Sequence, residues 1–490
     1  MQVSPLSFTY DIEAAAEIRP LFNVGSIFDR QCGRYMLGKY GESIMNGGLA
    51  MITGVGGRAN TYKSTLSHFF TLSVLNTYTH STAMIYDSEM SGTRFRLTDL
   101  ASAMENLKGI DLFKSGRLLF TDANVMTGDA WFDKVKAYAE RKLGLKKAER
   151  YGTTPMVDSE GNLYKSQYPS VIEADSLSRM PISAVDKQLD DNAIGESGNN
   201  TEALMANKAK HQMMIQLPVL TEEACMPFIM TAHVDDNIQL DAYAPPQKKL
   251  AFMNNKLKFK YVPNQFLFLP NNLWYCFSAE PLNNKTTKLA EFPADPSKPD
   301  VKSDLMEVLV QNLRGKYGMS GVPYSVLVSQ FEGVLPELTD FYYCKKTNSN
   351  YGIEGNDRNY YFSFAPHHKL QRTTVRHKLK ENPDLARAVE LTMGVCMDQQ
   401  LISNLPNYVR CTPQELYEDL KAMGYDWNVL LTNTTSKWTY LEDKCSLNFL
   451  SSMDLLRMRA GLYVPYWYKK VTGVDIDPKS SPILQNKAAA

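Results

Sequence analysis

Short apolar runs with polar residues at their C-terminal ends alternate with stretches of helical periodicity along the first half of the chain. From Gly48, GLAMITG predicts a buried strand, and KSTLSHFFTLSVLNTY after a glycine-rich turn has apolar residues at helical spacing. STAMIYDSE, SVIEADSLSRM and PFIMTAHVDD are further predicted strands, with predicted helices at 129–143 and 201–217 between them. This alternation favours an α/β fold, with a mostly parallel, twisted sheet that is flanked by helices and binds ligands at the carboxyl ends of its strands.

The pattern also divides the chain into a core and flanking parts. Residues 146–169 and 282–303 are polar and turn-rich, and SEGN in the first stretch is a hairpin signal. We therefore interpret both stretches as insertions into a core that runs over 46–345. The preceding residues, 1–45, are predicted to be a lead-in segment that contributes to oligomerisation.

Beyond about residue 365 the pattern turns helical. The predicted helices are 373–379, 384–397 and 413–423, and Asn382-Pro383 separates the first two. We expect residues 346–490 to form a smaller, mainly helical C-terminal region.

Composition limits the class and the compartment of the protein. Its 490 residues, 44% of them hydrophobic, suffice for one large core and a smaller satellite domain. Lys plus Arg and Asp plus Glu both number 53, so any surface that binds nucleic acid has to be local. The seven cysteines have no C-x-x-C spacing, which indicates a reducing compartment without structural zinc. Since the start is unlike a signal peptide and no run reaches about 18 apolar residues, we expect an intracellular, cytoplasmic protein without a membrane partner.

The segment GRANTYKST, residues 57–65, has most features of a phosphate-binding loop. Such a loop needs inward-facing backbone N–H groups, a helix N-terminus behind them, a lysine for the outer phosphates and a hydroxyl for magnesium. Gly57 opens the loop, Lys63 is expected to contact the terminal phosphates, and Ser64 is expected to bind Mg²⁺. The remaining residues expected to bind the nucleotide are Asn60, Thr61, Tyr62 and Thr65.

Tyr62 departs from the motif G-x-x-x-x-G-K-[ST], which has glycine directly before the lysine. We expect a tyrosine to be tolerated there if its φ stays negative. Taken alone, the segment fits an ordinary glycine-rich surface turn before a helix equally well. The GVG ahead of Gly57 also leaves open which glycine starts the loop.

Two further strand ends carry side chains that nucleotide hydrolysis needs. MIYDSEM brings Asp87 and Glu89 to the carboxyl edge, where Glu89 is a candidate catalytic base for a water that faces the γ-phosphate. SVIEADSLSRM brings Asp175 and Ser176 there, and Asp175 is expected to bind Mg²⁺ through water. The alternatives are a surface carboxylate for Glu89 and a helix cap for Asp175. Three strand-end elements in this order are far more specific than the loop alone.

The loop and these strand ends resemble the RecA family, and within it the UvsX-type recombinases of T-even phages. Those proteins also carry an aromatic residue directly before the loop lysine and a strand similar to YDSE. The resemblance runs patchily over about residues 20–395 and does not extend to 400–490. It implies a RecA-like sheet, ATP and Mg²⁺ as cofactors, and a phage-encoded protein that acts in the infected bacterial host.

The resemblance also implies roles for residues beyond the loop. His233 falls on the position that senses the γ-phosphate, and Arg314 and Lys316 fall on the basic pair that reaches the ATP of a neighbouring subunit. KKLAFMNNKLKFKY is similar to the end of the family's second DNA-binding loop, with Asn254-Asn255 where two glycines are common.

This lysine-rich segment supplies the candidate DNA contacts. Lysines neutralise phosphates and an aromatic side chain wedges between bases, which selects Lys248, Lys249, Phe252, Lys256 and Lys258. A solvated strand with outward lysines fits the alternating Lys256 and Lys258 equally well. The segment 190–201, which matches the first DNA-facing loop, is acidic and carries no basic residue.

Together these features predict an ATP-dependent, DNA-binding recombinase that forms filaments on single-stranded DNA. Its expected activity is homologous pairing and strand exchange in recombination, repair and replication. The expected partners are single- and double-stranded DNA, further copies of the chain in a helical filament or a ring, and loader and single-strand-binding proteins.

Two alternatives stay open. One is a DnaB-type hexameric replicative helicase, against which stand the KENPDLARAVE segment and the short stretch of about 45 residues ahead of the core. The other is an architectural DNA-binding filament protein with weak or no hydrolysis. Tyr62 favours it, whereas the retained loop lysine and carboxylates oppose it.

Three histidines, His367, His368 and His377, cluster in the C-terminal region. Since the sequence places no acidic or cysteine residue at ligand spacing from them, we interpret them as ordinary surface or core histidines and not as metal ligands.

Overall fold

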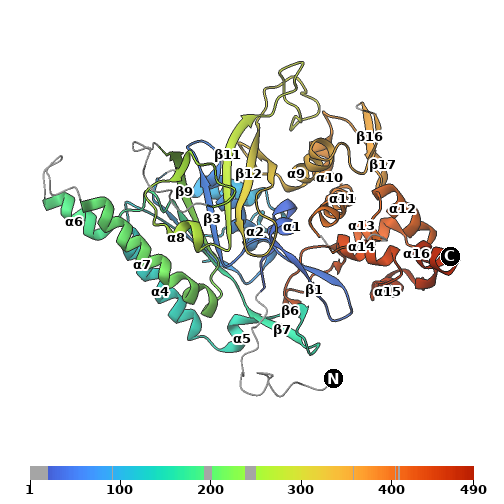
Figure 1. The fold of residues 1–490 in the computed structure, drawn as a ribbon, viewed down its shortest axis with the longest axis horizontal. Coiled ribbons are helices and arrows are strands. Elements are labelled where there is room, and N and C mark those ends of the chain that lie inside the picture. The colour runs from blue at the N-terminus through green and yellow to red at the C-terminus, as the bar shows by residue number, and fades with distance from the viewer. Residues whose placement is uncertain are drawn as a thin grey trace.

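The computed structural model describes residues 20–90, 92–191, 201–237, 250–356, 358–402, 404–406 and 409–489. Within these residues one sheet of ten strands organises the fold (Figure 1). Six neighbouring strands are parallel, in the spatial order β11 (Asn272–Pro281), β3 (Ile52–Gly57), β9 (Phe228–Asp236), β8 (Ser170–Asp175), β4 (Thr82–Asp87) and β5 (Leu118–Asp122).

Antiparallel strands complete this sheet. Beyond β11 follow β12 (Leu305–Gly315), β13 (Pro323–Ser329) and β14 (Gly333–Val334), and β10 (Leu257–Phe259) pairs with β9. The mostly parallel sheet confirms the predicted α/β fold.

Helices cover both faces of the sheet, because parallel strands present apolar side chains on each face. On one face lie α1 (Ser26–Cys32), α2 (Lys63–Thr77) and α3 (Arg94–Ser102). On the other lie α4 (Gly128–Leu143), α6 (Ser183–Asp191), α7 (Glu202–Glu223) and α8 (Gln265–Phe268).

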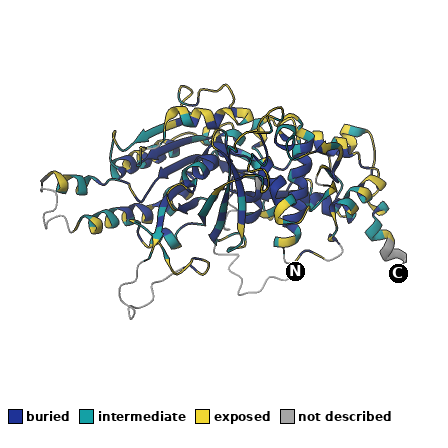
Figure 2. Cartoon of the chain, turned by 90° about the horizontal axis from the view of Figure 1, so that it is seen from above, coloured by how far each residue is buried: buried dark blue, intermediate teal, exposed yellow. Residues whose placement is uncertain are grey.

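The side chains of β4 show why two layers of helices are needed. Met84 and Tyr86 belong to the core beneath α4 and α7, whereas Ile85 between them belongs to the core beneath α2. Figure 2 shows the strands buried between helices whose outer faces are exposed. The sheet is therefore a fixed platform for the side chains at its carboxyl edge.

The described part of the lead-in segment, residues 20–45, packs into the molecule. Phe28 of α1 makes edge-to-face contacts with Phe70 and Trp274, at centroid distances of 5.0 and 5.1 Å. After α1, β1 (Arg34–Leu37) and β2 (Ser43–Asn46) form an antiparallel hairpin. The role of this segment in oligomerisation stays a prediction.

The two interpreted insertions are both anchored to the rest of the chain. The first forms α5 (Lys147–Arg150) and the hairpin of β6 (Tyr151–Val157) and β7 (Leu163–Gln167), with SEGN in its turn. Met156 of this hairpin is buried, and the backbone N–H of Thr153 donates to the Glu442 carboxylate at 2.9 Å. Residues 282–303 contain no helix or strand, yet Phe292 among them is buried.

The C-terminal region combines a small antiparallel sheet with helices (Figure 1). The sheet consists of β15 (Ile353–Asn356), β16 (Asn359–Phe362) and β17 (Ala365–Leu370). The predicted helices are present as α10 (Val375–Glu381), α11 (Pro383–Leu401) and α12 (Pro413–Ala422). The other elements are α9 (Pro336–Tyr342), which precedes the sheet, α13 (Trp427–Thr432), α14 (Ser452–Arg459), α15 (Tyr468–Thr472), α16 (Pro482–Ala489) and the short pair β18 (Thr434–Thr435) and β19 (Asn448–Phe449).

One apolar core runs from the edge of the main sheet into the C-terminal helices. Leu305 of β12 and Leu327 of β13 share it with Val389 and Leu391 of α11. This shared core does not mark a boundary at residue 345, which stays a prediction.

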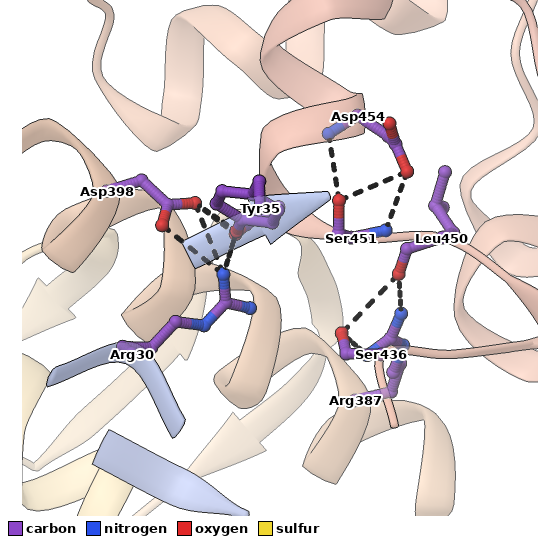
Figure 3. Close-up of polar contacts among 9 residues, drawn as sticks. Arg30, Tyr35, Arg387, Asp398, Ser436, Leu450, Ser451 and Asp454 are labelled. Atoms are coloured by element: carbon purple, nitrogen blue, oxygen red, sulfur yellow. Dashed lines mark hydrogen bonds and ion pairs between the residues drawn. The ribbon is translucent and has the colours of Figure 1, made fainter. Parts of the chain in front are cut away.

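A buried polar cluster ties α1 to the C-terminal helices (Figure 3). The guanidinium of Arg30 lies 3.3 Å from the Asp398 carboxylate in α11 and donates to Ser452 Oγ at 2.7 Å. The hydroxyl of Tyr35 donates to Asp398 at 2.8 Å. The side chains of Arg30 and Asp398 are only 4% and 3% exposed, so α1 and α11 are held together inside the molecule.

Candidate nucleotide-binding site

The loop between β3 and α2 has the form of a phosphate-binding loop. Thr61 Oγ1 donates to the carbonyl of Arg58 at 2.8 Å, which closes the turn before α2. A side chain at Gly57 would place its Cβ 2.3 Å from Thr61 Oγ1, so the tight turn requires glycine there. Lys63, Ser64 and Thr65 are the first residues of the fifteen-residue α2, whose N-terminal N–H groups border the loop.

Tyr62 does not keep the negative φ on which its tolerance in the loop was expected to depend. Its backbone has φ 60° and ψ 23°, the left-handed conformation that the glycine of the motif adopts freely. An L-residue in this conformation costs about 1 kcal/mol, and the half-buried ring packs against the core beneath α2. The tyrosine therefore keeps the backbone shape of the loop. It lacks the conformational freedom of glycine, and the packing of its ring offsets part of the strain.

Four strand ends meet beside this loop. In the register of the sheet, Gly57 pairs with His233, and Asp87 pairs with Asp175. Because these strands are parallel, their carboxyl ends lie at the same edge. The structure thus brings together the residues that the sequence places at separate strand ends.

Glu89 is the centre of the polar contacts at this edge. Its Oε1 accepts hydrogen bonds from Ser176 Oγ at 2.7 Å and from His233 Nε2, and it lies 3.8 Å from Lys63 Nζ. Partial burial opposes ionisation, but the hydrogen bonds from His233 and Ser176 and the charge of Lys63 lower the pKa of Glu89 to about 2. In this geometry Glu89 is a firmly ionised carboxylate and a weak base.

Asp87 and Asp175 shape the turns that carry the other side chains. Asp87 accepts hydrogen bonds from the N–H groups of Glu89, at 2.9 Å, and of Gly92, which fixes the turn after β4. Burial raises the pKa of Asp87, and the charge of Asp175 adds to the effect. Asp175 itself is buried and accepts a hydrogen bond from Thr231 Oγ1.

A buried ion pair that was not predicted from the sequence lies beneath the loop. His68 of α2 contacts Glu173 of β8 at 2.7 Å, and Ser67 and Thr71 donate to the same carboxylate. Burial disfavours both charges, yet each partner stabilises the other: the pKa of His68 is raised and that of Glu173 is lowered. The signal in the sequence was the spacing of three polar residues on one face of a helix otherwise rich in apolar residues.

A chain of contacts leads from His233 to the lysine-rich strand. The His233 N–H donates to Ser178 Oγ at 2.9 Å, Ser178 Oγ donates to the carbonyl of Lys260 at 2.8 Å, and the Lys260 N–H donates to the carbonyl of His233 at 2.9 Å. Strand β10, which carries Lys258, is therefore fixed to the end of β9.

The candidate DNA-binding residues are placed only in part. Lys256 and Lys258 are exposed, and Phe252 is 50% exposed. Lys248 and Lys249 lie outside the described residues, as do residues 192–200 of the other DNA-facing segment.

Arg314 and Lys316 do not join the site of their own chain. Arg314 pairs with Leu273 near the start of β11, and its Nε donates to the carbonyl of Pro270 at 3.1 Å. The start of β11 lies beside Thr53 of β3, four residues before Gly57. The backbone register thus puts this basic pair on the order of 13 Å along the strands from the loop, toward the opposite edge of the sheet.

Comparisons with known proteins find no match to a family model and no match to a curated protein. Among the solved structures that match is one described as the crystal structure of the RadB recombinase. It has 12% sequence identity and a TM-score of 0.32, and the match covers 59% of this chain and 93% of that one. A likeness at this level carries no argument of its own, and the α/β class rests on the strand order described above. None of the helices in the described residues has the length and apolar composition that crossing a membrane requires.

Proposed function

We propose that the chain is a DNA-dependent ATPase of the RecA type. The observation that carries the proposal is the meeting of Lys63, Glu89 and His233, from three different strand ends, beside a loop that runs into a helix N-terminus. Phosphoryl transfer depends on positioning and on charge stabilisation more than on covalent chemistry. A lysine, a carboxylate and a polar sensor at one edge of a parallel sheet meet that requirement.

ATP with Mg²⁺ fits the donor groups around the loop. The N–H groups at the start of α2 and the buried ammonium of Lys63 suit a polyphosphate. Ser64 and Asp175 offer the oxygen ligands that Mg²⁺ prefers, Asp175 through water. Bound ATP supplies the γ-phosphate that water attacks. Residues Asn60, Thr61, Tyr62 and Thr65 form the rest of the proposed nucleotide contacts.

The basicity of Glu89 depends on its neighbours. The charge of Lys63 and the hydrogen bond from His233 hold its pKa low. When Lys63 turns to phosphate oxygens and His233 contacts the γ-phosphate, Glu89 loses part of this stabilisation and becomes a stronger base. It then accepts the proton of a water at its carboxylate, which Ser176 continues to orient.

The proposed DNA surface is coupled to the nucleotide through His233. A shift of His233 toward a γ-phosphate pulls on Ser178 and on the backbone of Lys260, and so on β10. In this proposal β10 carries along Lys256, Lys258 and Phe252. The same proposed surface includes Lys248 and Lys249. Nucleotide binding thereby favours the state that grips DNA.

The position of Arg314 and Lys316 supports an assembly in which they act on a neighbouring subunit. Since they lie toward the edge opposite the loop of their own chain, head-to-tail stacking brings them to the loop of the next copy. Contacts of this heterologous kind make helical filaments unless they close into a ring. We therefore propose a recombinase that forms filaments on single-stranded DNA and promotes strand exchange.

ATP hydrolysis measured with and without single-stranded DNA tests the proposal. We expect turnover that DNA stimulates and that Lys63→Ala and Glu89→Gln both abolish. Glu105→Gln, which alters an exposed carboxylate away from the edge, is the matched control and should leave turnover unchanged. Absence of turnover in the unmodified chain would reject the ATPase.

Negative-stain images of the same samples separate the remaining assemblies. Helical filaments with DNA support the recombinase. Closed rings support the replicative helicase, and filaments on DNA without hydrolysis support the architectural protein.

A further inference from the structure

Three potential metal ligands converge in the C-terminal region, away from the nucleotide site. His367 Nε2 lies 3.1 Å and His368 Nε2 lies 2.7 Å from Oδ2 of Asp384. All three ligand atoms lie within 4.8 Å of one another. Within the described residues this is the one group of three or more His, Cys, Asp or Glu side chains that meets this criterion. The sequence prediction that these histidines lack an acidic partner is therefore wrong, because Asp384 is brought to them by the fold.

An irregularity in β17 explains how two adjacent histidines reach the same carboxylate. In a regular strand successive side chains point to opposite faces. Here β16 pairs with β17 through Phe362 and Ala365 at one end and through Tyr360 and Leu370 at the other. The two pairs are two residues apart on β16 but five residues apart on β17. The extra residues of β17 between Ala365 and Leu370 therefore form a bulge. The bulge turns both imidazoles toward α11, with ring centroids 4.2 Å apart.

Asp384 is held in place and kept ionised. It lies in the first turn of α11 directly after Pro383, where a carboxylate interacts favourably with the helix dipole. Partial burial opposes ionisation, but hydrogen bonds from His368 and His367 lower the pKa of the Asp384 carboxyl. The carboxylate and His368 are only 19% and 16% exposed, whereas His367 is 61% exposed and borders solvent.

We propose that His367, His368 and Asp384 form a binding site for a divalent transition-metal ion, with Zn²⁺ as the representative ion. Two imidazole nitrogens and one carboxylate oxygen are a donor set typical of Zn²⁺ and its neighbours. Ligand atoms around a tetrahedral zinc ion are about 3.3 Å apart, so the separations of 3.1 and 2.7 Å change only slightly on binding. The solvent side next to His367 leaves room for water as the remaining ligand.

The ring nitrogens that contact Asp384 also suit a metal ion. An imidazole that binds the ion through Nε2 has its ring proton at Nδ1, so Nε2 carries no proton while the ion is bound. The ion then joins β17 to the first turn of α11, so it fastens the small sheet to the helix that lines the C-terminal core.

Zinc titration of the full chain against a chromophoric chelator tests the site. The buffer contains a large excess of Mg²⁺, which occupies the oxygen ligands of the nucleotide site. We expect one Zn²⁺ per chain, and an affinity at least about tenfold weaker in His367→Ala, His368→Ala and Asp384→Asn. His377→Ala is the matched control, since the partly exposed His377 lies on α10 and pairs with Glu381 at 2.9 Å instead.

Two further measurements separate loss of the site from misfolding and from zinc binding at a cysteine. His367 is largely exposed, so His367→Ala folds even if the His368 variant does not, and circular dichroism checks both. Cobalt substitution should give visible absorption without a thiolate band, which excludes binding at Cys445 on the surface. Absence of zinc binding in the unmodified chain, or equal affinity in the His367→Ala and His377→Ala variants, would overturn the proposal.

Discussion

Tyr62 holds a backbone conformation that glycine adopts freely and tyrosine adopts only with strain. Tyr62→Gly removes both the strain and the ring packing, whereas Tyr62→Ala removes the packing and keeps the strain. We therefore expect the glycine variant to be more stable than the alanine variant by about 1 kcal/mol in urea unfolding.

Thr61 provides the control, since its φ is not positive. There the order should reverse, with alanine more stable than glycine, because the greater freedom of glycine in the unfolded chain is not offset by relief of strain. A glycine variant that is the less stable one at both positions would contradict the role assigned to the Tyr62 backbone.

The charge of Glu89 has a consequence for stability in acid. Its pKa falls from 4.5 to about 2 on folding, so ionised Glu89 stabilises the folded chain above pH 4.5, and this contribution is lost as the pH falls toward 2. We expect the unmodified chain to be more stable than Glu89→Gln at pH 5, and the difference to shrink at lower pH. Urea unfolding of both proteins across this range measures it, with Glu105→Gln as a variant that should show no such trend.

At the scale of elements, the parallel strands and the residues at their ends could be predicted, whereas their order in the sheet was not. Apolar runs that end in Asp87, Asp175 and His233 mark buried parallel strands, and the common edge of such strands brings those ends together. The positive φ of Tyr62 was not predicted, because tyrosine ordinarily avoids the left-handed conformation that it adopts in this loop. Asp384 was missed as a partner of His367 because a bulge and a helix start, not a sequence spacing, bring them together.

The ion pair of His68 and Glu173 joins the two elements on which the nucleotide site depends. α2 carries Lys63 and β8 carries Asp175, so the pair fixes the loop relative to the carboxylate that we propose binds Mg²⁺. Glu173→Gln leaves a buried imidazole without its counter-charge, and we expect the free energy of unfolding to fall by about 3 kcal/mol. Ser67→Ala, which removes one neutral donor to the same carboxylate, should lower it by about 1 kcal/mol.

The pH dependence identifies the charge as the cause. Because folding raises the pKa of His68, its contribution is complete below 6.5 and declines as the pH rises above that value. The advantage of the unmodified chain over Glu173→Gln in urea unfolding should therefore decrease from pH 6.5 upward. A difference that is independent of pH would mean that hydrogen bonding alone holds the pair.

At the scale of the whole molecule, contacts join the three parts that the pattern of the sequence predicts. The lead-in segment reaches the C-terminal helices through Arg30 and Asp398, and the apolar core continues from β12 into α11. Local periodicity does not reveal such contacts, since they join residues more than 350 positions apart. The sheet, the lead-in segment and the C-terminal region thus pack against one another, and the proposed nucleotide contacts and the proposed subunit contacts lie at opposite edges of the sheet.

That arrangement predicts complementation between two inactive variants. Lys63→Ala loses the loop lysine but keeps the basic pair, and a variant with both Arg314→Ala and Lys316→Ala keeps the loop and loses the pair. If the pair acts on the neighbouring subunit, mixing the two restores every site in which an intact loop meets an intact pair. In a random head-to-tail assembly of equal amounts, that is about a quarter of the sites, so DNA-stimulated ATP hydrolysis should return to about a quarter of the unmodified level.

The complementation also distinguishes a basic pair that acts on the neighbouring subunit from one that acts on its own loop. Each variant alone should be inactive at every concentration, and the activity of the mixture should rise with total protein as subunits assemble. If the basic pair instead serves its own loop, no mixed assembly contains a complete site and the mixture stays inactive. Because Lys63 and Arg314 lie at opposite ends of the parallel strands, the complementing outcome is the one that the strand register favours.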